Sequence, residues 1–517
     1  MRIIVDTNIL IQITNVGTEM PKTYADVLRM SAELGFEIAY LSTQVEDFNR
    51  DKNLVRRGIN LSRLRQYQEI DDAPIPSAEE LLRYRWSTNN PNDDVDNQLL
   101  YAIKRNVADF LVTQDKGVHA KARRENLQEQ VLTIDALCEF LKEQVNAHRE
   151  IHPVSAKVKR IKAYQLRIED TFFDSLRDSY AGFNDWFAKI SREGREAWVV
   201  QGDRQQILGL CIYKTEDGEQ ITDGGYRSLG KTLKLCTFKV AGIGSKLGEC
   251  LLQEAFNFAI LNGFSSIYLH VRLGSHARLV SLLEDFGFKC VGLYHEDEVF
   301  LKMMVPSRNR RFSVDSSTNV DFDIDYYPRH FDGTGVAKYM IPIQPEYHEK
   351  LFPDVYGKGL FSQGDGFVYS SESNAIKKAY ICNSNIKRIR PGDLVLFYRS
   401  HDVRGIDTVG FVEKVTLTAD FNKVFALVAR RTVFTDVAIR EKLRGKEALV
   451  ILFRLIQHLQ EPVSRRLLDE AGMVGEIQSV RRMPERMYRT LVKPRLHPWG
   501  LSCDPAEWYI VTDLKRN

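Results

Sequence analysis

The first 145 residues alternate short apolar strands with amphipathic helices, and this alternation limits the fold more than any other feature of the chain. The strand-like runs are RIIVDTNIL, FEIAYLS, DFLVTQD and VLTIDALCEFL, the last of which leads into a helix. Helical patterns such as TYADVLRMSAELG and VDNQLLYAIKRN lie between them. Alternating β and α elements predict a parallel sheet covered by helices, whose ligands gather at the carboxyl ends of the strands.

Four acidic residues fall where these strands and helices begin or end. Asp6 ends the first strand and Asp115 follows the third, so both are predicted at the carboxyl edge of the sheet. Glu46 follows the second strand, and Asp96 opens a helix. Carboxylates gathered at one place repel each other, and a hard cation such as Mg²⁺ or Mn²⁺ relieves that repulsion. Such an ion can activate water for attack on a phosphodiester.

The order of these motifs resembles the PIN-domain nucleases over residues 1 to about 142 of a domain predicted at 1–145. Asn8 completes the VDTN signature of that family, and Thr7 and Thr113 would orient the carboxylates. The helix opens with D-D-x-D, so Asp93 or Asp94 remains an alternative to its third aspartate. The resemblance implies that the metal ligands and catalytic residues of an RNA-cleaving site are Asp6, Glu46, Asp96 and Asp115.

A second α/β segment is predicted at residues 161–305, after a polar linker at 146–160. It holds the strand LKLCTFKV, a glycine-punctuated turn before a helix, the strand SSIYLHV and the helix LVSLLEDFGF. This order resembles the GNAT acyl-CoA-dependent acetyltransferases, in which backbone N–H groups of the turn bind the CoA pyrophosphate. The resemblance implies acetyl-CoA as a second cofactor, with candidate contacts at Gly242, Gly244, Ser245, Lys246 and Gly248.

Two registers of the glycine-punctuated turn are open. One begins at Lys239 and uses the first two glycines of the turn. The other ends at Gly248 and places Ile243 where the family has Arg or Gln. We favour the second because the first removes too much chain after the strand. In this register Lys246 partly replaces the missing pyrophosphate side chain.

The family's general acid, a tyrosine on the later helix, is also missing. Leu283 stands at the corresponding position, and His270 and His276 are nearby alternatives. A scaffold that binds a nucleotide-like ligand or another domain is therefore the alternative to an active transferase.

The remaining segment, residues 325–517, follows a linker at 306–324 and is rich in short strands. The turn Pro391-Gly392-Asp393 precedes LVLFYRS, and DTVGFVEKV forms the next strand. This pattern resembles the PUA-like β-barrels, including the ASCH and EVE branches, and implies a pocket for a nucleobase or a short RNA strand. Phe397 and Tyr398 alternate faces, so one of them can line that pocket. Candidate RNA-binding residues are Asn374, Lys377, Lys378, Arg399, Arg481, Arg482 and Tyr488.

Composition sets broad limits on the 517-residue chain. A net charge of +3 is too small to imply nucleic-acid binding by itself. Seven unclustered cysteines indicate neither a zinc knuckle nor a disulfide framework, and they fit a reducing cytoplasm. No apolar run approaches the roughly 20 residues that a membrane span needs, and no signal peptide is evident. A cytoplasmic protein without membrane contact is expected.

The predicted architecture is a multidomain α/β and α+β chain, with a PIN-like parallel sheet, a GNAT-like domain and a PUA-like barrel. Its expected function is a metal-dependent RNA endonuclease, in which the C-terminal domain selects RNA (tRNA is one candidate) and the GNAT-like domain is accessory. The alternatives are an acetyl-CoA-dependent N-acetyltransferase acting on RNA-linked or protein amines, and a non-enzymatic RNA-binding regulator. The toxin-like domain combination suggests an inhibitor protein as a further partner, and the oligomeric state is open.

Overall fold

The chain divides into two compact units of mixed α/β structure. Unit 1 comprises Met1–Ile151, Thr418–Arg430 and Asp436–Gly445, and unit 2 comprises His152–Leu417, Arg431–Thr435 and Lys446–Asn517. In this computed structural model, the residues described are 1–14, 20–86, 91–147, 157–202, 206–241, 246–273, 277–306, 320–333, 335–352, 355, 376–383, 386, 388–428 and 436–496.

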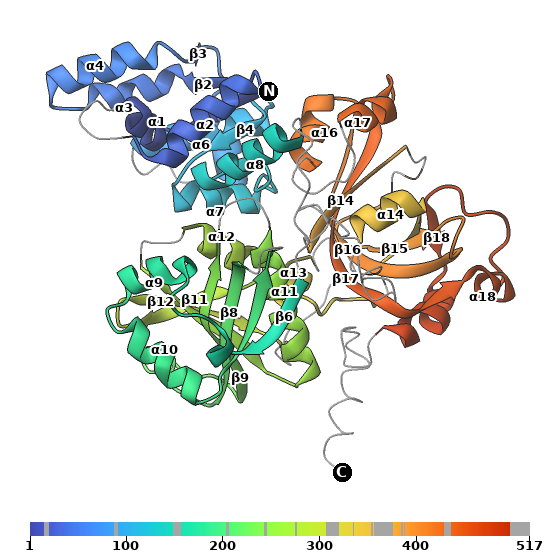
Figure 1. Cartoon of the computed structure of the whole chain (residues 1–517). Helices are drawn as coiled ribbons and strands as arrows, with labels where there is room; N and C mark the ends of the chain where they lie inside the picture. The colour runs from blue at the N-terminus through green and yellow to red at the C-terminus, as the bar shows by residue number, and fades with distance from the viewer. Residues whose placement is uncertain are drawn as a thin grey trace. The chain divides into compact units, whose positions relative to one another are not determined.

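Unit 1 is built around a five-stranded sheet with the order β3-β2-β1-β4-β5 (Figure 1). Every strand pairs in parallel with its neighbours, which confirms the parallel sheet predicted from the alternating pattern. Its elements are β1 (Arg2–Val5), α1 (Thr7–Thr14), α2 (Lys22–Glu33), β2 (Glu37–Leu41), α3 (Val45–Asn49), α4 (Leu54–Leu64), β3 (Gln68–Ile70), α5 (Ala78–Tyr84), α6 (Pro91–Lys104), β4 (Phe110–Val112), α7 (Lys116–Arg124), β5 (Val131–Leu132), α8 (Ile134–Ala147), α16 (Phe421–Val428) and α17 (Asp436–Leu443).

The first strand lies at the centre of this sheet because its side chains are apolar on both faces. Ile3 and Ile4 are both fully buried. Strand β1 has β2 on one side and β4 on the other, so the connections run in opposite directions from this point. A crevice forms outside the carboxyl ends of the strands at such a switch point. The residues that follow β1 and β4 therefore lie at the same edge of the sheet.

Unit 2 contains two sheets. The first has seven strands in the order β11-β12-β10-β9-β8-β7-β6, and the second has six in the order β14-β17-β16-β15-β13-β18. The elements of the first are β6 (Lys157–Lys162), α9 (Asp174–Ser179), α10 (Phe183–Arg192), β7 (Glu196–Gln201), β8 (Ile207–Asp217), β9 (Lys231–Val240), α11 (Leu247–Leu261), β10 (Ser266–Arg272), α12 (Ala277–Asp285), β11 (Lys289–Tyr294) and β12 (Asp297–Met303).

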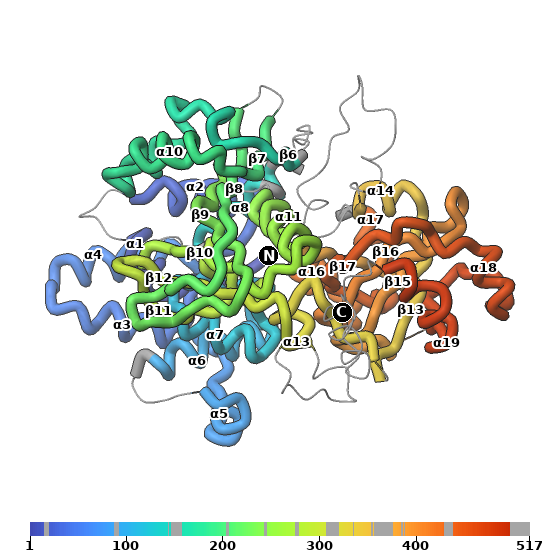
Figure 2. The backbone as a smooth tube through the Cα atoms, turned by 90° about the horizontal axis from the view of Figure 1, so that it is seen from below, coloured from blue at the N-terminus to red at the C-terminus, as the bar shows by residue number. Residues whose placement is uncertain are grey.

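The elements around the second sheet follow in chain order, and Figure 2 shows α14 lying against its strands. They are α13 (Val320–Asp325), β13 (Lys338–Ile343), α14 (Pro345–Leu351), β14 (Lys377–Cys382), β15 (Leu394–Arg399), β16 (Gly405–Thr418), β17 (Ala448–Ser464), α18 (Arg465–Glu470), β18 (Arg481–Met483) and α19 (Glu485–Met487).

The seven-stranded sheet is covered by different helices on its two faces (Figure 1). Leu233, Leu235 and Ile267 point to the face where α11 and α12 pack. The helices α9 and α10 pack on the opposite face, where Phe187 and Ile190 meet Ile212. Because side chains alternate along a strand, the residues between the leucines of β9 point toward α10. The alternation therefore tells on which face of the sheet each polar side chain of β9 lies.

The six-stranded sheet is strongly curved. Strands β14 and β13 are separated by three strands in the sheet order, a distance of about 19 Å across a flat sheet. Yet the hydroxyl of Tyr380 on β14 donates a hydrogen bond to the carbonyl of Pro342 on β13 at 2.9 Å. Among the described residues the terminal strands β14 and β18 are not paired, so the predicted barrel is present only as an open, curved sheet.

Charged side chains join the two sheets of unit 2 in the interior. The ammonium of Lys377, which is 2% exposed, lies 2.9 Å from the Asp285 carboxylate of α12 and 3.5 Å from Glu413 of β16. The carboxylate of Glu249 on α11 accepts a 2.9 Å hydrogen bond from the backbone N–H of Ile376. The predicted boundaries between the second and third domains stay predictions. No helix among the described residues is both long and apolar enough to cross a bilayer.

We predict that Lys377→Met lowers the free energy of unfolding of unit 2 by about 3 kcal/mol. The substitution leaves the partly exposed Asp285 carboxylate without its cation and removes one of two cations beside the buried Glu413, which keeps Arg454 at 2.8 Å. An unpaired charge in the interior is costly. Urea denaturation measures the change. The matched control is Arg466→Met, because that side chain is 83% exposed in a surface ion pair and its loss should cost less than about 0.5 kcal/mol. Equal effects of the two substitutions would contradict the internal role of Lys377.

Candidate active site

The seven-stranded sheet opens between two of its parallel strands. Strands β9 and β10 pair from Thr232↔Ser266 to Leu235↔Leu269, and the pairing stops there although both strands continue. At the same point the register of β9 against β8 shifts, which leaves Cys236 as an extra, bulged residue. A bulge bends a strand and commonly occurs beside active sites. Here the second half of β9 leaves β10.

A cavity of about 850 Å³ lies at this divergence. That volume is within the range of small-molecule and cofactor sites. Its wall combines the ends of α9, the helix α10, the second half of β9 and the end of β10. The polar and charged side chains in the wall include Ser175, Tyr180, Lys189, Glu193, Arg195, Lys214, Lys234, Cys236, Thr237, Lys239, His270, Arg272 and Asp297.

Two side chains that line the cavity, Cys236 and His270, have shifted pKa values. Burial raises the pKa of the Cys236 thiol, whose sulfur accepts a 3.7 Å contact from Arg195. Burial, together with Lys234, lowers the pKa of His270 to about 4, so its imidazole is neutral at pH 7. The His270 Nε2 atom is buried and has no hydrogen-bond partner within the described part of the chain. A neutral imidazole with one uncommitted nitrogen can accept a proton from a ligand.

The glycine-punctuated turn is described only in part. Gly242, Gly244 and Ser245 lie outside the described residues, as does His276. Lys246 adopts a left-handed conformation, with φ of 47°, immediately before α11. A Cβ atom at Gly248 would lie 2.9 Å from the end of the Leu282 side chain, so glycine here allows α12 to approach α11.

The position of the missing tyrosine belongs to the hydrophobic core. Leu283 is fully buried among the side chains of α11 and the strands it covers. Of the two histidines named as alternatives, the described one, His270, lines the cavity. Sequence patterns did not single out Cys236 or Lys234, because only the bulge and the strand alternation place them on the cavity side.

In unit 1, three of the four predicted acids are brought together. Asp6 is only 4% exposed; burial raises its pKa, and the charges of Asp115 and Asp47 raise it further. The Thr113 hydroxyl and the Asn8 amide both donate to the Asp6 carboxylate, the latter at 2.8 Å. This position follows from the register of β1 and β4, because Asp6 N–H donates to the carbonyl of Val112.

Asp96 completes the group from the start of α6. Burial is the largest cause that raises its pKa; together with the charges of Asp6 and Asp115, and against the opposing charge of Lys121, it brings the pKa to about 7. The raised pKa of this carboxyl reflects its burial first and the neighbouring negative charges second. Asp93, one of the two alternatives in D-D-x-D, also raises the pKa of Asp96, but its charge has a smaller effect than those of Asp6 and Asp115.

The helix α3 presents a different acid from the predicted one. Glu46 is exposed, whereas the neighbouring Asp47 accepts a 2.9 Å hydrogen bond from the Thr7 hydroxyl and raises the pKa of Asp6. Sequence reasoning missed Asp47 because E-D offers two acids in adjacent positions. Within the described residues, no group of three or more His, Cys, Asp or Glu side chains is arranged to hold a metal ion. The charges of these acids act on one another, but the described side chains do not form a ligand set.

Most of the predicted RNA-binding residues of the C-terminal sheet have internal roles. Lys377 and Lys378 are 2% and 1% exposed, and Tyr488 is fully buried, with its hydroxyl donating to Asp332 at 3.1 Å. Arg481 is half-buried and donates to the carbonyl of Val474 at 2.7 Å. Of the remaining candidates, Arg482 is exposed and Asn374 lies outside the described residues.

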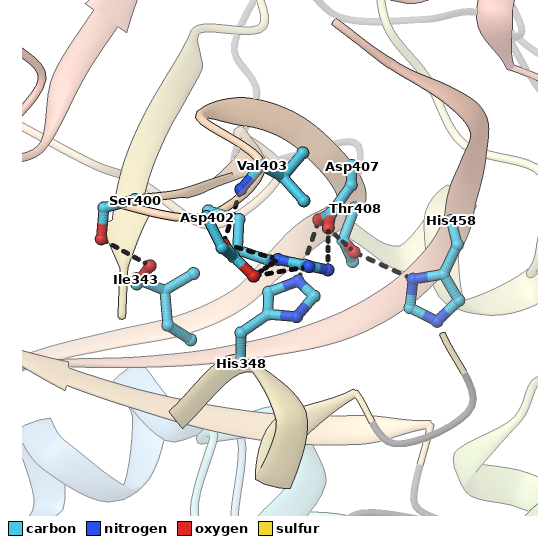
Figure 3. Close-up of polar contacts among 9 residues, drawn as sticks. Ile343, His348, Ser400, Asp402, Val403, Asp407, Thr408 and His458 are labelled. Carbon is cyan, nitrogen blue, oxygen red and sulfur yellow. Dashed lines mark hydrogen bonds and ion pairs between the residues drawn. The ribbon is translucent and has the colours of Figure 1, made fainter. Parts of the chain in front are cut away.

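A polar network around Asp402 and Asp407 (Figure 3) includes Arg399, the last residue of β15. Its guanidinium binds Asp402 at 2.6–3.0 Å and lies 3.5 Å from Asp407. His348 of α14 bonds the other Asp407 oxygen at 2.9 Å. Thr408 donates to the same oxygen and contacts His458 of β17 at 2.9 Å. The network connects α14 to β15, β16 and β17. Because the Arg399 guanidinium is already paired with carboxylates, it is less able to bind an RNA phosphate.

Comparison with known proteins gave structural neighbours only. No family model matches the chain, and no curated protein matches it. Among solved structures, the ASCH protein from Zymomonas mobilis is 17% identical, with a TM-score of 0.23, over 30% of this chain and 94% of its own. A PaiA N-acetyltransferase from Thermoplasma acidophilum in complex with coenzyme A is 16% identical, with a TM-score of 0.23, over 29% and 99%. The AtaT toxin, bound to acetyl-CoA and its antitoxin AtaR, is 10% identical, with a TM-score of 0.21, over 29% and 93%.

We predict that the Asp96 carboxyl titrates near pH 7 and that Asp115→Asn lowers its pKa by about one unit, because one of the repelling charges is removed. Carbon-13 NMR of the aspartate side-chain carboxyls measures both values. Asp109→Asn is the control, because Asp109 is not among the groups that shift the Asp96 pKa. An Asp96 pKa near 4 in the wild-type protein would show that these acids do not interact.

Proposed function

We propose that unit 2 binds an acyl-CoA, with acetyl-CoA as the first candidate, and transfers its acyl group to an amine. The observation that supports this most directly is the divergence of β9 from β10 at the Cys236 bulge, with a cavity of about 850 Å³ beside it. Beyond Leu235 the described backbone of β9 has no partner on the β10 side. An extended ligand with amide groups can hydrogen-bond to such an unpaired strand edge, as the pantetheine arm of CoA would.

The chemistry required of the protein is modest. The amine nitrogen attacks the thioester carbonyl carbon, the carbon–sulfur bond breaks, and the departing thiolate takes a proton from water. The amine must lose one proton, and we assign its acceptance to His270 Nε2, because His270 lines the cavity and this atom has no partner among the described residues. The lowered pKa of His270 means that the imidazole would pass this proton on to solvent and not keep it. The cavity wall from α10 would exclude bulk water from the thioester.

Binding of acetyl-CoA to the full chain tests this proposal. Isothermal titration calorimetry is expected to give one site per chain, and Cys236→Leu is expected to weaken binding at least tenfold, because the added atoms fill the opening beside β9. Cys290→Leu is the matched control, because this cysteine is exposed on β11 outside the cavity wall. Circular dichroism establishes that both variants are folded. Absence of acetyl-CoA binding by the wild-type protein would refute the proposal.

The predicted metal-dependent ribonuclease is our second candidate. The observation in its favour is the mutual charge repulsion of Asp6, Asp96 and Asp115 at the carboxyl edge of a parallel sheet. These residues, together with Asp47, would be the ligands of any Mg²⁺ or Mn²⁺ ion, which would supply an activated water for phosphodiester attack. RNA as the substrate of this site is part of the same proposal, as is an inhibitor protein.

Incubation with total RNA, with Mn²⁺ or with EDTA, tests the second candidate. Asp6→Asn and Asp47→Asn are each expected to reduce cleavage at least 100-fold, whereas Glu46→Gln is expected to leave it within about twofold because Glu46 is exposed. Glu46→Gln is the matched control, because it removes an adjacent acid from the same helix. Cleavage that survives in EDTA or in Asp6→Asn would rule out this assignment.

A further inference from the structure

The cavity beside β9 carries an excess of positive charge. Its lining side chains include two acids, Glu193 and Asp297. They also include six cations, which are Lys189, Arg195, Lys214, Lys234, Lys239 and Arg272. Histidine adds no charge at neutral pH, because the pKa of His270 is about 4. A cavity lined by one sign of charge concentrates ligands of the other sign.

Most of these cations are already engaged by protein groups. Arg195 pairs with Glu193, and Lys214 pairs with the buried Glu216. Lys239 donates to Ser175 at 2.6 Å. Arg272 donates to the carbonyl of Ser179 at 2.7 Å and lies 3.4 Å from Glu296. These cations still make the electrostatic potential of the cavity positive, but part of their N–H groups already donate to protein acceptors.

Lys234 differs from them. Its side chain is half-buried, and within the described residues it has no hydrogen bond and no ion pair. Its ammonium lies 5.2 Å from the centre of the Tyr268 ring. The closest acid that acts on it, Glu216, already binds Lys214 and the Tyr268 hydroxyl. Burial lowers the pKa of Lys234, which reflects the cost of holding this charge away from water.

Lys234 and the start of α11 lie on opposite faces of the seven-stranded sheet. Leu233 and Leu235 point into the core under α11 and α12, so Lys234 points to the opposite face, toward α10. The start of α11, at Leu247, is on the first face. An anion bound by Lys234 is therefore distinct from a pyrophosphate at the start of α11, and it lies where His270 and Cys236 also line the wall.

We propose that this cavity binds the acceptor of acyl transfer and that the acceptor is a small amine carrying a carboxylate or phosphate group, which Lys234 binds. This inference rests on the proposed transferase function and names its substrate class. The bound anion gives the Lys234 ammonium the partner that the protein does not provide, and charge-assisted hydrogen bonds of this kind are short and strong. Polycationic amines, by contrast, would be repelled by the surrounding lysines and arginines.

The test compares amines that differ only in the anion. Acyl transfer from acetyl-CoA to a panel of α-amino acids and phosphoethanolamine is measured by thiol release, alongside the matching amino-acid amides, ethanolamine and spermidine. The anionic members are expected to have kcat/KM values at least tenfold above their neutral counterparts.

Lys234→Met is expected to raise KM for the anionic acceptor 10- to 100-fold. The variant should leave KM for acetyl-CoA within twofold and cause no loss of activity with the amides. Lys231→Met is the control, because Lys231 lies on the same strand, is exposed and binds the carbonyl of Asn262 outside the cavity.

A second measurement separates this inference from the proposed function. Binding of N-acetyl amino acids and N-acetyl phosphoethanolamine to the full chain, without acetyl-CoA, is compared with binding of their neutral counterparts by calorimetry. Binding of the anions that is lost in Lys234→Met, in a protein that does not bind acetyl-CoA, would keep the anion site and reject the transferase. Acetyl-CoA binding with preferred transfer to amides or spermidine would reject the anionic acceptor and keep the transferase. Absence of any preference for the anions in both measurements overturns the inference.

Discussion

The bulge at Cys236 is the local constraint on which the candidate active site depends. While β9 and β10 remain paired, their backbone groups satisfy each other and no ligand can enter. One extra residue in β9 shifts its register against β8, bends the strand and ends its pairing with β10 after Leu235. The same bend creates a free strand edge and the cavity wall. Binding and chemistry at this site would therefore both follow from one change in hydrogen-bond register.

Buried cations in unit 2 fall into two groups, and the distinction supports the functional assignments. Lys302 is fully buried and donates to the carbonyls of Phe286 and Asp325, and Lys377 pairs with carboxylates from two other elements. These residues hold the two sheets of unit 2 together. Lys234 has no such partner among the described residues. Because burial of an unpaired charge is costly, an anion bound in the cavity, as we propose, would stabilise the Lys234 ammonium.

In unit 1, in contrast to the buried cations of unit 2, negative charges gather at one place. Asp6, Asp96 and Asp115 come from three separate elements, and the sheet forces them to one edge. Their repulsion is partly relieved by protonation, since the pKa of Asp96 rises to about 7, and by donors such as the Thr113 hydroxyl. Their arrangement favours a cation without defining a ligand set, which is why the nuclease remains the second candidate.

The sequence by itself determined the element order and, through it, the parallel sheet of unit 1 and the common edge shared by Asp6 and Asp115. These features follow from local periodicity and from the rule that ligands gather at the carboxyl ends of parallel strands. The tertiary structure decided which side chains reach each site. Adjacent residues on a helix point about 100° apart, so packing alone selects Asp47 over Glu46. Composition could not distinguish a lysine that holds the core, such as Lys377, from one that faces a cavity, such as Lys234, because that depends on partners far apart in the chain.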